Sequence, residues 1–213
     1  MEQEKNIKYE KINHKHLKGL ADLHLEVSTE ENFLPLLGEK CVMKFYEWWI
    51  LRNDVITYVA VDGERVVGHV LGPLNLDYRN NLNKFLFRYL FFGFIKAIFV
   101  HPLRLINLSL KRFNLILLSL KGLLYRKVKT KDFGNERCIL LSIAVDPEYQ
   151  GKGVAKKLND LFLEEAKIKG KKEVTLSVRA SNARAIAFYK KMGWKIFEKE
   201  GSSIYFIRYL YEK

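Results

Sequence analysis

Cysteine and proline are scarce in this 213-residue chain. The two cysteines, Cys41 and Cys138, lie far apart and lack metal-ligand spacing, and the five histidines form no metal motif. We therefore expect buried, reduced thiols and neither a disulfide framework nor a metal site. Only four prolines interrupt a composition that is 48% hydrophobic, which is typical of a folded protein.

Long apolar runs are also missing. No stretch of about 18 uncharged apolar residues occurs that could span a bilayer. The first ten residues, MEQEKNIKYE, contain no apolar segment of the kind found in signal peptides. These absences predict a cytoplasmic protein, and the length predicts one domain over residues 1–213.

Acidic residues are absent from one segment, residues 78–131, which contains twelve Lys or Arg and so holds nearly all of the net charge of +13. The segment is rich in Leu, Ile and Phe. Phe85, Phe92 and Phe99 recur every seven residues and so share a helical stripe, and Pro102 divides the segment into two or more helices. We expect a basic, apolar, helical insertion.

Three roles for this insertion stay open. Its helices could cover the domain or a second copy in a homodimer, forming one wall of a substrate site. They could instead lie on an anionic membrane surface, since apolar faces bordered by Lys and Arg are attracted to it. Nucleic acid is the least favoured partner, because the phenylalanines are spaced for burial and not for base stacking.

Elsewhere the pattern predicts a mixed α/β domain. Asp62-Gly63 marks a hairpin, and the uniformly apolar CILLSIAV, residues 138–145, is typical of a strand covered on both faces. A parallel βαβ unit should follow from it. Helices are expected over residues 16–27, 40–51, 153–169 and 182–192, and strands over residues 6–11, 55–61, 65–71, 138–145, 173–178, 194–200 and 203–210.

Two glycines stand where strand 138–145 gives way to a helix, in YQGKGVAKKL. A helix N-terminus has unpaired N–H groups, and glycine lets the backbone approach an anion such as phosphate. Lys152, Lys156 and Lys157 add positive charge. The segment is neither a dinucleotide fingerprint, since a third glycine is missing, nor a P-loop, since no Gly-Lys-Ser/Thr ends it.

The segment Gln150-Gly151-Lys152-Gly153-Val154-Ala155 resembles the Q/R-x-x-G-x-G/A motif of the GNAT superfamily of N-acetyltransferases. A second stretch, Asn182-x-x-Ala185-x-x-x-Tyr189-x-x-x-Gly193-Trp194, is similar to that family's other motif. The resemblance is close over residues 136–213 and loose over residues 1–75, and it does not extend to residues 78–131. It implies a mostly antiparallel central sheet with a parallel βαβ core and flanking helices, and a helical insertion between the third and fourth strands.

The resemblance implies acetyl-CoA as co-substrate, with its pyrophosphate on the amides of residues 151–155. Pantetheine would lie where strand 138–145 splays from strand 173–178, an edge whose free backbone groups suit an extended amide arm. The implied cofactor-binding residues are Ile143, Ala144, Val145, Gln150, Gly151, Lys152, Gly153, Val154, Ala155, Asn182 and Tyr189.

Transfer of an acetyl group to an amine needs an acid for the departing thiolate and a base for the amine. The resemblance makes Tyr189 the acid, since a phenol with a pKa of about 10 keeps its proton at neutral pH. Glu31, or its neighbour Glu30, is the candidate base, because both lie between the first two helices, a region that borders the acceptor site in this family. Ser142 is a further possible contact.

The expected activity is acetyl transfer from acetyl-CoA to a primary amine by direct attack in a ternary complex. The acceptor is a small molecule or a peptide, and the positive charge favours an anionic or lipid-linked amine. The alternative is a non-catalytic adaptor that keeps the CoA fold and uses its basic helices to bind a membrane or a protein partner.

Overall fold

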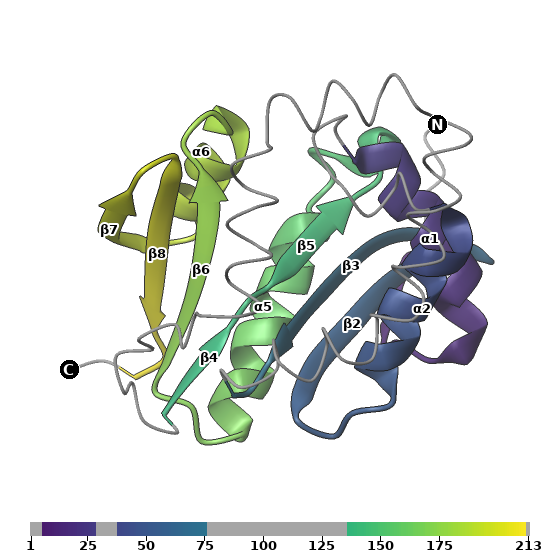
Figure 1. Ribbon diagram of the computed structural model, residues 1–213, viewed down its shortest axis with the longest axis horizontal. Helices are drawn as coiled ribbons and strands as arrows, with labels where there is room; N and C mark the ends of the chain where they lie inside the picture. Colours follow the sequence, from purple (N-terminus) through teal and green to yellow (C-terminus); the bar gives the residue numbers. More distant parts are fainter. Residues whose placement is uncertain (1–5, 29–37, 76–135, 212–213) are drawn as a thin grey trace, which may run out of the picture.

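The computed structural model describes residues 6–28, 38–75 and 136–211 (Figure 1). The insertion 78–131 and the candidate bases Glu30 and Glu31 lie outside the described residues. Of the described helices, none is both long and apolar enough to cross a membrane. The side chains of Cys41 and Cys138 are both buried, as predicted.

The described elements follow the predicted order, and apart from strand 138–145 their ends fall within two residues of the prediction. The first part of the chain forms β1 (Lys8–Glu10), a short 3-10 turn η1 (His14–His16), α1 (Leu17–Val27), α2 (Glu39–Ile50), β2 (Val55–Asp62) and β3 (Arg65–Pro73). The second part forms β4 (Arg137–Ile139), β5 (Ser142–Val145), the 3-10 turn η3 (Pro147–Tyr149), α5 (Val154–Ile168), β6 (Glu173–Arg179), α6 (Ala183–Lys191), β7 (Lys195–Glu200) and β8 (Ser203–Tyr209).

The strand expected over residues 138–145 is two strands, which belong to different sheets. β5 completes a sheet of order β1-β2-β3-β5, and β4 begins a second sheet of order β4-β6-β8-β7. β4 and β6 run parallel, whereas the other recorded strand pairs are antiparallel. The single central sheet of the sequence prediction is therefore divided in two, although the mixed α/β class and the parallel βαβ unit are confirmed.

The change of sheet takes place between Leu140 and Leu141. The N–H of Leu140 donates to the carbonyl of Thr175 in β6, at 2.9 Å, and the N–H of Leu141 donates to the carbonyl of Leu71 in β3, at 3.0 Å. Beside this point an added Cβ on Gly72 would lie 1.8 Å from the carbonyl oxygen of Ile139. Glycine at residue 72 thus allows the strand to cross close to β3 as it passes between the sheets.

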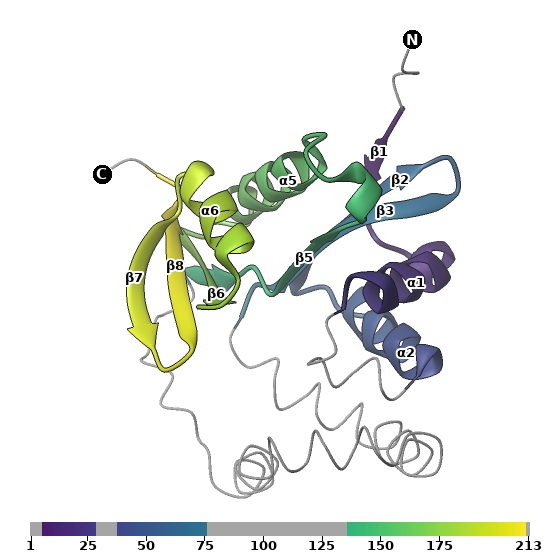
Figure 2. The same cartoon turned by 90° about the horizontal axis from the view of Figure 1, so that it is seen from above.

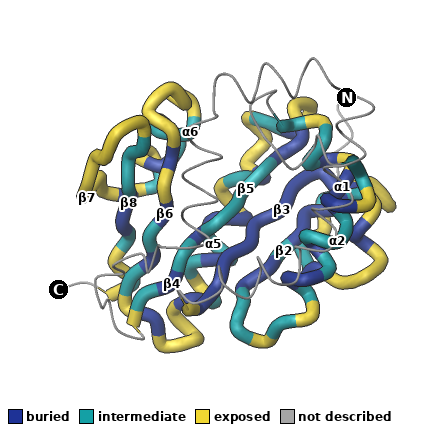
Figure 3. The backbone as a smooth tube through the Cα atoms, viewed as in Figure 1, coloured by how far each residue is buried: buried dark blue, intermediate teal, exposed yellow. Residues whose placement is uncertain are grey.

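Helices cover both faces of the first sheet. In Figure 2, α5 lies on one face, and α1 and α2 lie on the other. Each face has its own apolar core: Phe162 and Leu158 of α5 pack on one side, and Trp49 and Leu20 pack on the other. Figure 3 shows β3 buried along nearly its whole length, whereas β7 is exposed. This arrangement fixes β5 and the loop that follows it between two packed layers.

Candidate functional site

The glycine loop ends in a helix N-terminus that none of the described side chains caps. Gly151 and Gly153 have φ angles of +77° and +82°, a left-handed conformation that favours glycine. A Cβ on either glycine would meet no protein atom within 4 Å, so the space beside them is open. Gly153 is the N-cap of α5 and accepts the first helical bond from Lys157. The N–H groups of residues 153–156 therefore have no partner within the helix.

Charge at this N-terminus is positive. The first turn of α5 contains no acidic residue. Lys152 is exposed, with its Nζ 5.6 Å from the centre of the Tyr149 ring. Lys156 forms an ion pair with Asp160 at 2.8 Å, so part of the predicted positive charge is compensated within the helix.

Neighbouring elements hold the glycine loop in place. Tyr149 donates its hydroxyl hydrogen to Asp62 at 2.6 Å, and the Gln150 side chain donates to the carbonyl of Val145 at 3.1 Å. Arg65 forms ion pairs with Asp146 at 2.6 Å and with Glu148 at 2.8 Å. The β2–β3 turn thus positions both ends of η3, just before the glycines.

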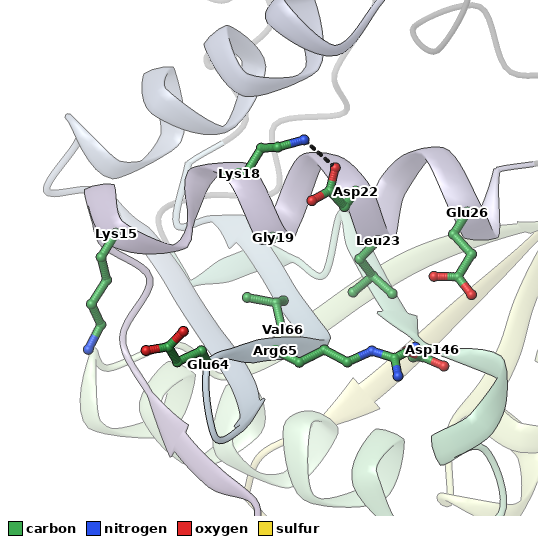
Figure 4. Close-up of a pocket in the computed structure, with 10 residues that line it drawn as sticks. All are labelled: Lys15, Lys18, Gly19, Asp22, Leu23, Glu26, Glu64, Arg65, Val66 and Asp146. Carbon is green, nitrogen blue, oxygen red and sulfur yellow. Dashed lines mark hydrogen bonds and ion pairs between the residues drawn. The ribbon is translucent and has the colours of Figure 1, made fainter.

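A pocket of about 380 Å³ lies beside this anchor, between α1 and the β2–β3 turn. Figure 4 shows the Arg65 guanidinium against Asp146, and acidic and basic side chains around it, such as Glu64 and Lys15. The lining contains none of the residues predicted for cofactor binding or catalysis. We assign it to the support of the loop and not to the reaction site.

In the described part of the chain, β5 pairs with β3 on one side and has no partner strand on the other. The N–H of Asp146 donates to the carbonyl of Val67, and antiparallel strands alternate the direction of their backbone groups. Ala144 therefore turns its backbone groups to β3, and Ile143 and Val145 turn theirs to the open edge. Because Gln150 already occupies the carbonyl of Val145, the N–H groups of Ile143 and Val145 and the carbonyl of Ile143 face outward.

Beyond Thr175, the edge of β6 on the side of β4 has no partner strand among the residues that the structure describes. β6 pairs with β8 along Glu173–Arg179, but with β4 only as far as Thr175. Figure 1 shows β5 and β6 diverging from the end of β4. The predicted splay between the two strands is thus present, and the glycine loop lies at the far end of β5.

Tyr189 lies in α6 and is only 5% exposed. The rings of Trp194 and Phe206 lie 5.6 and 5.8 Å from its ring. Burial raises the pKa of the Tyr189 phenol above its usual value. Its hydroxyl makes no hydrogen bond within the described part of the chain. Nearby, Asn182 caps α6, because its Oδ1 accepts from the N–H of Ala185 at 3.0 Å.

Residues 123–194 match the model of the acetyltransferase (GNAT) family. The matched residues make up about a third of the chain, and over them the chain is similar to GNAT acetyltransferases. A stretch of 59 residues is 41% identical to the [ribosomal protein bS18]-alanine N-acetyltransferase of Escherichia coli strain K12, covering 28% of this chain and 40% of that protein. Over 58 residues it is 33% identical to N-alpha-acetyltransferase 30 of Schizosaccharomyces pombe, covering 27% of this chain and 39% of that protein. The chain thus spans about 40% of the length of these curated relatives.

The fold is similar to that of a solved N-acetyltransferase. The PaiA N-acetyltransferase from Thermoplasma acidophilum, solved in complex with coenzyme A, superposes with a TM-score of 0.61 at 15% identity. The match covers 96% of this chain and 99% of that one. At this level of identity the likeness shows a shared fold.

The described structure also contains a largely buried polar network that the sequence did not predict. Tyr46 in α2 lies between two histidines: its hydroxyl is 3.0 Å from Nδ1 of His24 in α1 and 3.2 Å from Nε2 of His69 in β3. The same Nε2 lies 3.2 Å from the hydroxyl oxygen of Ser142 in β5. The one available signal was a histidine in the middle of the apolar run VVGHVLG, residues 66–72.

The structure brings most of the predicted site residues to one region. Residues 143–145 lie on β5, residues 150–153 lie in the loop after it, and residues 154–155 begin α5. Tyr189 lies on α6, which follows β6, and Asn182 is the N-cap of that helix. Their contacts with a cofactor stay predictions. Two side chains have structural partners: Gln150 holds Val145, and Asn182 caps its own helix.

Proposed function

We propose that this chain is an acetyl-CoA-dependent N-acetyltransferase. The observation that carries the proposal is the open edge of β5, which leads directly to an uncapped, acid-free helix N-terminus. The pyrophosphate of acetyl-CoA suits the N–H groups of residues 153–156, since two glycines leave space for it and the helix dipole is positive there.

The pantetheine arm would run back along β5 from the glycine loop. Its amides can pair with the N–H and carbonyl of Ile143 and the N–H of Val145, as an added strand would. The four residues of β5 span about 13 Å at roughly 3.3 Å each. The arm would end at the point where β4 pairs with β6 and the gap between β5 and β6 ends, which puts the thioester beside residues 140–142.

The reaction would be direct. The amine nitrogen attacks the thioester carbonyl carbon, a C–N bond forms, the C–S bond breaks, and the sulfur takes a proton. We assign that proton to the Tyr189 hydroxyl, whose raised pKa keeps it protonated at neutral pH. Glu31, with Glu30, remains the candidate base that takes the amine proton, a prediction outside the described residues.

The first acceptor to test is the α-amine of a peptide that begins with alanine. One curated relative is named for an alanine of a ribosomal protein, and another is named an N-alpha-acetyltransferase. An α-amine has a pKa near 8, whereas that of a lysine is about 10.4, so more of it is neutral at pH 7. An anionic or lipid-linked amine, which the charge favours, is the second acceptor class to test.

Two measurements test the proposal. Calorimetry should show binding of CoA and acetyl-CoA to the full chain, and thiol release should accompany acetylation of the peptide amine. Binding without turnover on any amine of either class would favour the non-catalytic alternative. Failure of the folded protein to bind either form of the cofactor would refute the proposal.

We further propose that the basic segment 78–131 makes a peripheral membrane contact. The support is its sequence: twelve Lys or Arg without an acid, among apolar residues at helical spacing. Vesicles containing anionic phosphatidylserine should carry the protein upward on flotation at low salt and less of it at high salt. A protein left unbound at both salt concentrations would refute the membrane contact, and the insertion would then be a wall of the acceptor site or a surface for a homodimer.

A further inference from the structure

Acetyl transfer also requires a donor to the thioester carbonyl oxygen, because that oxygen gains negative charge as the amine attacks. The position proposed above for the thioester, beside residues 140–142, places this oxygen near Ser142. Ser142 is half-buried and lies at the N-terminal end of β5, the end away from the glycine loop.

The side chain of Ser142 points to the face of the sheet that α1 and α2 cover. Its hydroxyl oxygen contacts Nε2 of His69 on β3, which in turn contacts Tyr46 of α2. Tyr189 lies in the other core, with α5 and Phe206. The proposed proton donor for the sulfur thus belongs to a different apolar core from the one that the Ser142 side chain faces.

The environment of His69 settles which ring nitrogen carries its proton. Nδ1 is buried and has no hydrogen-bond partner in the described structure, whereas Nε2 has two. A buried N–H without an acceptor is costlier than a buried lone pair. We therefore assign the proton to Nε2, whose single hydrogen is shared between the hydroxyl oxygens of Ser142 and Tyr46.

The rest of the network follows from that tautomer. Since Tyr46 accepts from His69, it donates its own hydrogen to Nδ1 of His24. Burial lowers the pKa of His69 to about 3, so the ring stays neutral at physiological pH. The oxygen of Ser142 is occupied by the His69 donor, and its hydrogen remains available to a ligand in the splay.

We propose that the Ser142 hydroxyl donates a hydrogen bond to the thioester carbonyl oxygen of bound acetyl-CoA, and that His69, Tyr46 and His24 position it. This inference rests on the proposed function. When the amine attacks, the C=O electron pair moves to the oxygen, which Ser142 stabilises. When the C–S bond breaks, the pair returns and the thiolate takes its proton from Tyr189. Ser142 keeps its proton throughout.

Carbon-13 NMR of acetyl-CoA labelled at the thioester carbonyl tests the bond directly and needs no acceptor. Bound to the wild type, the carbonyl resonance should move downfield from its free position. In Ser142→Ala most of that downfield shift should be lost, whereas Ser142→Thr, which keeps a hydroxyl, should preserve the shift. His69→Leu should give an intermediate shift, because Ser142 loses the donor that orients it.

Turnover separates a role in the transition state from a role in binding. With the alanine peptide as acceptor, Ser142→Ala should lower kcat by about 10- to 100-fold, a loss typical of one donor to a developing oxyanion, and change the KM for acetyl-CoA little. Ser142→Thr should recover most of kcat. If Ser142 only supported the fold, its loss would not lower kcat alone while leaving the KM for acetyl-CoA unchanged.

Three results would overturn the inference. The first is a Ser142→Ala protein that binds labelled acetyl-CoA with the wild-type carbonyl shift, since another group would then polarise the carbonyl. If Ser142→Ala does not fold, an unchanged shift in His69→Leu overturns the positioning role instead. A wild type that binds acetyl-CoA without any carbonyl shift refutes this inference alone, whereas a wild type that fails to bind refutes the proposed function as well.

Discussion

Alanine at Gly153 and alanine at Gly170 form a matched pair, because these glycines lie at the two ends of α5. Their φ angles are +82° and +73°, and at neither position would an added Cβ meet a protein atom within 4 Å. Each substitution therefore costs the strain of a left-handed alanine, about 1–2 kcal/mol. For a chain of this size each kcal/mol lowers the Tm by roughly 2–4 °C. The two variants should thus lose similar thermal stability.

Cofactor binding should separate the pair. A Cβ at residue 153 would occupy the space beside the unpaired N–H groups, where the pyrophosphate is proposed to lie. Loss of one charge-assisted hydrogen bond, about 1.5–3 kcal/mol, weakens binding by about 10- to 100-fold. Gly170→Ala adds its Cβ at the opposite end of the helix and should leave the affinity unchanged.

Calorimetric titration of CoA into both variants, beside thermal unfolding of each, is the assay. The reasoning is wrong if Gly153→Ala binds CoA as tightly as Gly170→Ala does. It is also wrong if both lose affinity equally, because the loss would then follow stability and not the position of the phosphate site.

Three further substitutions address the acid, the sheet crossing and the buried histidine. Tyr189→Phe should lower kcat by about 10²-fold or more. It should change the free energy of unfolding by under about 1 kcal/mol, since the lost hydroxyl has no hydrogen bond in the described structure, and unchanged turnover would exclude Tyr189 as the acid. Gly72→Ala should destabilise the fold by about 3 kcal/mol or more in urea unfolding, because its Cβ would overlap the Ile139 backbone. Gly68→Ala should cost less, because its Cβ would lie no nearer than 3.1 Å to two side chains and 3.2 Å from the Ala144 carbonyl oxygen, and equal costs would contradict the close crossing. The pKa of His69 is about 3 in the folded protein and about 6.5 in the unfolded chain, so only the unfolded chain takes up this proton as the pH falls from 6.5. The free energy of unfolding should therefore fall by up to about 5 kcal/mol between pH 6.5 and pH 3, and His69→Leu should remove that loss. If the free energy of unfolding of the variant falls as steeply with decreasing pH as that of the wild type, His69 does not cause the loss.

Local pattern was sufficient to predict most of the described elements. The stripe of α2 and the Asp62-Gly63 turn depend on residues close together in sequence, and so does the glycine loop before α5. Each was predicted because propensity and spacing act over a few residues.

The division of residues 137–145 between two sheets was not predictable in the same way. CILLSIAV is apolar throughout, so nothing in its pattern marks the change at Leu140 and Leu141. The change depends on Gly72 and Thr175, which lie far away in sequence and reach the strand only in the folded protein.

The residues of the candidate site also differ in whether local sequence predicts them. The glycines and Tyr189 belong to local motifs and were identified from the sequence. His24, Tyr46 and His69 become a network with Ser142 only through contacts between α1, α2, β3 and β5. The sequence placed each of them in a separate element and gave no spacing that connects them.

The most direct test of the central claim is a titration of CoA into nitrogen-15-labelled protein, followed by backbone amide resonances. The account predicts that the N–H resonances of residues 153–156 and of Ile143 shift most, because those groups would bind the pyrophosphate and the pantetheine arm, and that Gly170 does not respond. Binding that leaves residues 153–156 unshifted would contradict it.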